Sequence, residues 1–158
     1  MEKSNGAVEM AAQKDAVQKN LQFVGFMLGK EEYAFDIQAV QQIVKHMPIT
    51  RVPKAPFYYK GMFNLRGSVL PVVDSHLRFG LPQEEATEAS RIIILRHEDI
   101  SMGFTVDRVT EVVTLGPDQI EKSQPVDGID NQFVKGIGKL GARLLILLDL
   151  PIVLGIAN

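Results

Sequence analysis

The side chains in this sequence that could perform chemistry include three histidines. His46, His76 and His97 occur in three different contexts and show no HxH, HxxxH or HExxH spacing, so they lack the pattern of a metal site. The chain has no cysteine, which excludes disulfides, thiolate catalysis and cysteine-ligated zinc. It also has no GxGxxG or GxxxxGKS/T phosphate loop and no GxSxG nucleophile turn. The sequence therefore favours a binding module with no cofactor over an enzyme.

The carboxylates offer no catalytic pair either. Glu84-Glu85 and Glu98-Asp99 fall in expected loops, where charges are normally solvated. Asp74 and Asp149 end two matching apolar stretches. That symmetry predicts that both residues cap the turn that follows, rather than act as a unique acid or base.

Composition narrows the remaining classes. The 158 residues, 46% of them hydrophobic, suit one domain or two small subdomains sharing a core. A net charge of −2 and an isoelectric point near 5.9 give no basic surface for nucleic acid. The aromatic residues 57–59 are flanked only by Lys54 and Lys60, which favours packing over base stacking.

No segment of the sequence is typical of secretion or membrane insertion. Residues 1–20 lack the apolar core of a secretory signal, and we expect them to form a flexible tail. The longest unbroken apolar run, 144–148, is far shorter than the roughly 20 residues of a spanning helix. We therefore expect a cytoplasmic globular protein.

From Leu21 onward the sequence is typical of short strands. Residues 21–28 and 32–37 flank a Gly-containing turn and predict a hairpin. The stretch 37–44 suits either one or two helical turns or a short helix running into a strand. Prolines at 48, 53 and 56 predict an ordered connector, and 80–90 is the best candidate for a flexible linker.

An internal repeat is the most informative feature of the chain. Residues 59–81 match 134–156 with an offset of 75, and 33–44 match 102–113 with an offset of 69. Two matches in the same order favour duplication over the shared composition of small β proteins. Each copy supplies about five short strands, enough for a small closed barrel. We therefore expect an all-β fold of two five-stranded barrels related by a pseudo-twofold axis, with few short helices. The first barrel should cover roughly 21–80 and the second 90–150, followed by a short segment 150–158.

The repeat also isolates one unusual side chain. In "FNLRGSVLPVVD" (63–74), Arg66-Gly67 joins two strands, whereas the second copy uses Gly141-Ala142. The turn thus needs a glycine but no arginine. Arg66 is either a solvated turn residue or a planar five-donor group displayed for a partner.

The sequence resembles a known family at these same motifs. "YYKGMFNLRGSVLPVVD", preceded by "ITRVPKAP", resembles the signature of CheW-type chemotaxis coupling proteins. "MGFTVDRVTEVVTL" and "KGIGKLGARLLILLDL" resemble the second half of that family. The similarity runs from about Leu21 to Leu154.

This resemblance implies a fold of two SH3-like barrels and a scaffold without catalytic activity. The partners implied are the regulatory domain of the histidine kinase CheA and methyl-accepting chemotaxis receptors, which would hold the chain at the inner face of the membrane. The implied receptor contacts are Ile37, Val40, Gln42 and Arg66. Family members often carry Glu at the position of Gln42, so an ion pair with Arg66 is not expected here. Arg91 and Ile92, in the strand 91–95 that opens the second barrel, are the candidate kinase contacts, unless that strand is an ordinary core strand.

Two alternatives follow from the same observations. Within the family, the chain could be a free-standing equivalent of the kinase regulatory domain. From a different class, a small β-barrel could bind an oligonucleotide or a small ligand.

Overall fold

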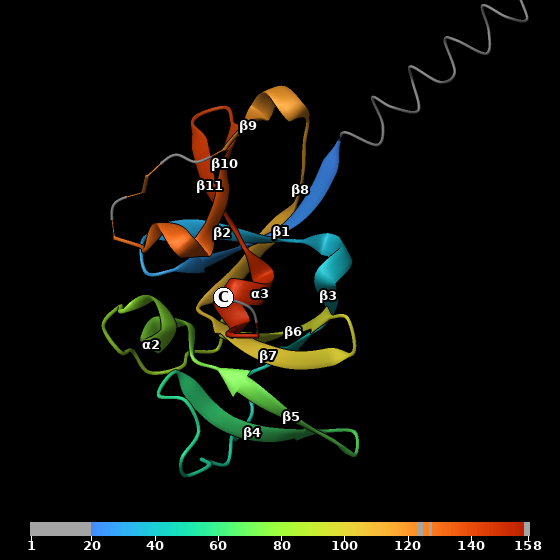
Figure 1. The fold of residues 1–158 in the computed structure, drawn as a ribbon, viewed down its shortest axis with the longest axis vertical. Helices are drawn as coiled ribbons and strands as arrows, with labels where there is room; N and C mark the ends of the chain where they lie inside the picture. Colours follow the sequence, from blue (N-terminus) through green and yellow to red (C-terminus); the bar gives the residue numbers. More distant parts are fainter. Residues whose placement is uncertain (1–19, 123–124, 127, 157–158) are drawn as a thin grey trace, which may run out of the picture.

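Short β-branched segments form two sheets in the computed structural model, which describes residues 20–122, 125–126 and 128–156 (Figure 1). The predicted tail lies almost wholly outside the described residues. The elements in the first part of the chain are β1 (Leu21–Leu28), β2 (Glu31–Asp36), the 3-10 helix η1 (Ile37–Ala39), β3 (Val40–Lys45), β4 (Tyr59–Leu65), β5 (Ser68–Val73) and α2 (Ser75–Phe79). They are followed by β6 (Arg91–His97), β7 (Ile100–Val106), β8 (Arg108–Leu115), η2 (Pro117–Gln119), β9 (Ile120–Lys122), η3 (Asn131–Phe133), β10 (Val134–Leu140), β11 (Arg143–Leu148) and α3 (Leu150–Leu154). No helix among these is long and apolar enough to cross a membrane.

Several local predictions are confirmed. The first hairpin turns at the predicted glycine, between Leu28 and Glu31. The stretch 37–44 is a short 3-10 helix that runs into a strand, the second of the two alternatives. The segment 81–90 contains neither a helix nor a strand.

The division into two consecutive barrels is wrong, because the two halves exchange hairpins. One sheet has the strand order β8-β1-β2-β11-β10-β9, and the other has β3-β6-β7-β5-β4. The hairpin β1–β2 thus belongs with residues 108–148, and β6–β7 belongs with residues 40–73. The exchange depends on two parallel pairings between distant strands, β2 with β11 and β5 with β7. Such long-range pairing leaves no mark on the local strand pattern.

The duplication itself is confirmed by the topology. The order β3-β6-β7-β5-β4 becomes β8-β1-β2-β11-β10 when each strand is replaced by its repeat partner. The registers agree as well, since Val72 pairs with Gly103 and its counterpart Leu147 pairs with Ala34. Strand β9 is the one addition to the six-stranded sheet. The fold is therefore two barrel-like β subdomains, each assembled from both halves of the chain.

The two short helices, α2 and α3, have equivalent caps at both ends. Asp74 Oδ1 accepts the Leu77 N–H at 3.1 Å, and Asp149 Oδ1 accepts the Ile152 N–H at 3.4 Å. Each helix stops at a left-handed glycine, Gly80 or Gly155. The predicted capping role of both aspartates is confirmed.

The largest core cluster lies along the seam between the subdomains and is built on aromatic rings. Phe26 stacks on Phe35 with ring centroids 5.3 Å apart, and Phe35 meets Phe104 edge to face at 5.2 Å. Burial here raises the pKa of Tyr33 to about 12, with a smaller contribution from the charge of Glu31. The shared core holds the two sheets, and the turns at their ends, in one arrangement.

Candidate functional site

Three connections meet at one end of the five-stranded sheet, which we call the turn end (right side of Figure 1). Strands β5 and β7 are parallel, so the turn before β5 and the turn before β7 lie at the same end. Strand β3 is antiparallel to β6, with Val40 opposite Leu95, so η1 and the start of β3 lie there too. The topology thus brings Ile37, Val40 and Arg66 to one end, with β6 and β7 between β3 and β5.

The side chains of η1 and β3 differ in their freedom to bind. Asp36 Oδ1 accepts the Gln38 N–H at 2.9 Å and fixes the start of η1. Ile37 is half-buried and belongs to none of the three core clusters. Val40 is also half-buried but packs against the largest cluster. Ile37 is therefore the freer of the two predicted apolar contacts.

A bulge in β3 determines where its glutamines lie. Val40 opposes Leu95 and Gln42 opposes Ile94, which leaves Gln41 as the extra residue. Gln41 Oε1 accepts a hydrogen bond from Ser101 Oγ at 3.0 Å. Gln42 is half-buried and makes no hydrogen bond to Arg66 among the described residues.

Arg66 occupies a strained position at the tip of its hairpin. Its φ is 53°, in the left-handed region that side chains other than Gly and Asn rarely adopt. The next residue, Gly67, has φ 89° and donates its N–H to Asn64 Oδ1 at 2.8 Å. In the second copy the equivalent of Arg66 is Gly141, with φ 62°. Both copies therefore need positive φ at this position, and only the first places an arginine there.

Apolar side chains lie exposed beside Arg66. Val69 is 58% exposed and Ile100 is 43% exposed. Val69 is the second residue of β5 and Ile100 is the first residue of β7, so both lie near the turn end of their strands. An arginine next to an exposed apolar pair is a common composition for a protein-binding surface.

A cleft of about 440 Å³ opens next to η1 and joins the two subdomains. One wall comes from η1 and the β6–β7 turn, and the other from β10, the end of β11 and the start of α3. The lining residues are Asp36, Gln38, Ala39, Arg96, His97, Glu98, Lys135, Leu148, Asp149, Leu150 and Pro151. Arg96 and Lys135 are not identified as residues of this cleft from the sequence alone. The repeat pairs Lys135 with Lys60, and this match was the one signal in the sequence that singled out Lys135.

Arg91 and Ile92 do not form an exposed pair. Ile92 has no exposed surface and packs with Phe63, Val72 and Ile94, so the ordinary core strand was the correct alternative. Arg91 is half-buried, and its guanidinium donates to the carbonyls of Glu88 and Ser90, both at 2.8 Å. Alternation of polar and apolar residues normally shows which side chains of a strand are exposed. Strand β6 lacks this alternation because it is buried on both faces at 92–95.

Comparison with known proteins identifies the fold family. The family model described as the CheW-like domain matches residues 22–157. The chain belongs to the CheW-like family. It is 41% identical to the chemotaxis protein CheW of Helicobacter pylori over 128 residues, covering 81% of this chain and 78% of that protein. The corresponding protein of Bacillus subtilis is 38% identical, with 82% and 83% covered.

A solved CheW structure supports the same conclusion. The scaffolding protein TtCheW from Thermoanaerobacter tengcongensis aligns with a TM-score of 0.79 and 37% identity, over 84% of this chain and 91% of that one. CheW proteins are non-enzymatic chemotaxis scaffolds, and this membership makes the chain a coupling scaffold as well. Nothing in the comparisons favours an oligonucleotide-binding or ligand-binding barrel.

Proposed function

We propose that this chain joins the histidine kinase CheA to the cytoplasmic tips of methyl-accepting chemotaxis receptors. The observation that carries the proposal is the turn end, where Ile37, Val40 and Arg66 lie at one end of the five-stranded sheet and an open cleft adjoins η1. A receptor tip is a helical hairpin, and apolar side chains on such a helix dock into apolar grooves. Binding to receptors would hold the chain at the inner face of the membrane.

Arg66 is proposed to fix the register of the receptor on this surface. A guanidinium presents five donors in a planar fork, which suits carboxylates and the carbonyls at a helix end. Among the described residues Arg66 makes no ion pair, so its donors remain available to a partner. Its left-handed backbone is a cost that the fold avoids in the second copy by using Gly141.

The kinase regulatory domain is proposed to dock on the six-stranded sheet. Leu144 on β11 is 58% exposed, the same fraction as its repeat partner Val69. It lines a cleft of about 380 Å³ together with Ile137, Ile146 and Lys139. The two copies of one exposed apolar position would thereby serve two different partners. A scaffold of this kind transmits signals through geometry and differential affinity.

Co-sedimentation tests both contacts. Wild-type chain, Ile37→Glu and Leu144→Asp are mixed with receptor-containing membranes and, separately, with immobilised kinase regulatory domain. We expect Ile37→Glu to lose binding to the receptor-containing membranes and to keep binding to the kinase regulatory domain. Leu144→Asp should lose binding to the kinase domain and keep binding to the membranes. Arg91→Ala tests whether Arg91 is the kinase contact instead. Retention of wild-type chain on single-stranded DNA, without binding to receptor membranes, would overturn the proposal.

A further inference from the structure

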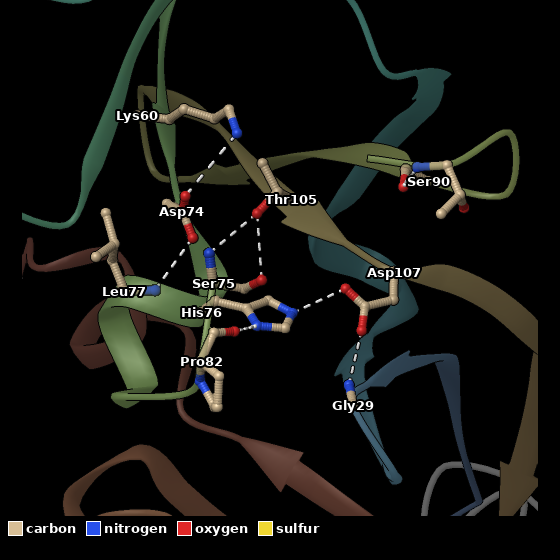
Figure 2. A network of polar contacts seen from close by, with 11 residues as sticks. Gly29, Lys60, Asp74, Ser75, His76, Leu77, Pro82, Ser90, Thr105 and Asp107 are labelled. Carbon is tan, nitrogen blue, oxygen red and sulfur yellow. Dashed lines mark hydrogen bonds and ion pairs between the residues drawn. The ribbon is translucent and has the colours of Figure 1, made fainter. Parts of the chain in front are cut away.

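The buried ring of His76 holds the segment that follows α2. His76 is only 7% exposed. Its Nδ1 lies 2.7 Å from the carbonyl oxygen of Pro82, and its Nε2 lies 2.8 Å from Asp107 Oδ1 (Figure 2). A carbonyl and a carboxylate only accept hydrogen bonds, so both ring nitrogens must donate. This geometry requires the doubly protonated, charged form of His76.

The partners of His76 come from distant parts of the fold. Asp107 lies between β7 and β8, where the chain crosses from one sheet to the other. Its second oxygen, Oδ2, accepts the Gly29 N–H of the β1–β2 turn at 2.7 Å. Beside the ring, Ser75 N–H donates to Thr105 Oγ1 at 3.0 Å (Figure 2). A single imidazolium thus links α2, the segment after it, the crossover and the opposite hairpin.

Other charged and titratable groups face the same place. They line a cavity of about 40 Å³ around the ring and come from the end of β3, from β4, from the cap of α2 and from the segment after α2. These groups are His46, Lys60, Asp74, Glu84 and Glu85. Burial by itself lowers the pKa of His76, but the bonds to Asp107 and Pro82 and the charges of Asp107 and Asp74 raise it above its ordinary value. The pKa of His46 is lowered, by burial and by Lys60.

The repeat shows what the segment after α2 does. The cavity around His76 and the open cleft beside η1 are lined by equivalent positions of the two copies. The pairs are Lys60 with Lys135, Asp74 with Asp149, His76 with Pro151, Thr105 with Asp36 and Asp107 with Gln38. The open cleft holds about 440 Å³ and the His76 cavity about 40 Å³, and residues 83–86 line only the smaller one. Residues 83–86 therefore fill, in one copy, a cleft that stays open in the other.

We propose that residues 81–90 form a strap over this cleft, latched by His76 between the Pro82 carbonyl and the Asp107 carboxylate, and that the strap loosens when His76 loses its proton. The second copy has no such latch, because Pro151 replaces His76 and Gln38 replaces Asp107. Neutral His76 has one ring nitrogen without a proton, so one of its two acceptors loses its donor. The closed strap thus binds the proton, and it weakens as pH rises through the raised pKa of His76.

Two measurements on the full chain test the latch. Nuclear magnetic resonance follows the ring protons of His76 from pH 5.5 to 9. In parallel, a glutamate-specific protease cleaves after Glu84, Glu85 and Glu88, with the products assigned by mass spectrometry. A free peptide of residues 81–90 corrects for the pH dependence of the protease. As pH rises, the corrected cleavage rate should increase, and the midpoint of this increase should coincide with the midpoint of the His76 titration. The increase should be about tenfold for each unit by which the pKa of His76 is lower in the open strap than in the closed strap.

Variants separate the latch from general unfolding. His76→Gln should be cleaved at a corrected rate that does not depend on pH, and Asp107→Asn should shift the His76 midpoint and the cleavage midpoint to lower pH together. His97→Gln, at a partly exposed histidine of the open cleft, should behave as wild type. A His76 midpoint at or below the ordinary value would overturn the latch, and so would flat corrected cleavage while His76 titrates. If His76→Gln fails to fold, the wild-type titration and Asp107→Asn still decide.

Discussion

Phe35 and Phe104 occupy the same position in the two copies of the repeat, and their rings pack edge to face 5.2 Å apart. Contact between equivalent residues places them near the pseudo-twofold axis. Arg78 and Val153, another equivalent pair, are joined there by a hydrogen bond from Arg78 Nε to the Val153 carbonyl at 2.9 Å. The axis therefore passes through a core that belongs to both subdomains.

The shared core predicts one cooperative unfolding transition. Phe104 is wholly buried, so Phe104→Ala should lower the free energy of unfolding by about 3–5 kcal/mol through lost contacts and a cavity. Urea titration followed by circular dichroism measures the change. Phe57→Ala, at a side chain 72% exposed, is the control and should change stability by no more than about 0.5 kcal/mol. Separate transitions for the two sheets would contradict a common core.

Receptor binding should respond differently to charge at two neighbouring positions. Ile37→Glu should leave the fold intact and weaken receptor binding at least about tenfold, because desolvating an unpaired carboxylate costs several kcal/mol. Val40→Glu should weaken binding and also lower the melting temperature, because Val40 packs against the core. Thermal melts and co-sedimentation separate the two effects. If Ile37→Glu binds receptors with normal affinity, η1 is not part of the docking surface.

A charge cluster on the six-stranded sheet predicts part of the acid sensitivity of the fold. Glu32 accepts hydrogen bonds from Arg143 Nε and Nη2 at 3.2 and 2.8 Å, and from Thr110 Oγ1 at 2.6 Å. Burial alone raises the pKa of Glu32, but these bonds and the charge of Arg143 outweigh it and lower the pKa. The folded pKa is therefore below the unfolded one, and the stabilisation is present above the unfolded value and lost as pH falls through the folded value.

Glu32→Gln should remove this contribution. We expect a loss of about 1.5–3 kcal/mol at pH 7, the range for hydrogen bonds to a charged group, and a smaller loss below about pH 4. Urea unfolding at several pH values measures both. The control is Glu88→Gln at an exposed glutamate of the segment after α2, which should change stability at pH 7 by no more than about 0.5 kcal/mol. A pH-independent difference between wild type and Glu32→Gln would show that the carboxylate is not stabilised as its contacts indicate.

The repeat predicted that the two copies share one architecture and that Asp74 and Asp149 are caps, because offsets of 75 and 69 residues carry local structure from one copy to the other. It did not predict the hairpin exchange, because parallel pairing of β2 with β11 depends on contacts more than 100 residues apart. Ile92 was misplaced for a related reason: a strand buried on both faces shows no alternation of apolar and polar residues.

The strain at Arg66 was also beyond the sequence pattern. Arg66-Gly67 has an obvious glycine for a tight turn, and nothing within this turn itself shows that Arg66 needs positive φ as well. The equivalent Gly141 carried that information, since glycine there signals a left-handed backbone. In the same way, the repeat pairs Lys60 with Lys135, but the letters do not show that Lys60 lines the cavity around His76 and Lys135 lines the open cleft. Only the structure shows that these two sites are equivalent.

Arg66 should contribute more to assembly than to stability. Arg66→Ala should change the free energy of unfolding by less than about 0.5–1 kcal/mol, because the side chain is exposed. It should cost about 1.5–3 kcal/mol of receptor binding, the range for hydrogen bonds to a charged group. Lysine should restore binding only in part, since it keeps the charge but loses the planar fork. Co-sedimentation with receptor membranes and thermal melts measure the two quantities.

Exchanging the two copies of this turn separates backbone strain from recognition. Arg66→Gly should leave stability unchanged or raise it by up to about 1 kcal/mol, because relief of the left-handed strain offsets the entropy of the added glycine. It should still lose receptor binding. Gly141→Arg should cost about 1 kcal/mol of stability, since it places a side chain at φ 62°, and should leave receptor binding unchanged. If Arg66→Gly binds receptors normally, the arginine is a solvated turn residue. If it unfolds the chain, Arg66 is a structural residue and the comparison with Gly141 does not hold.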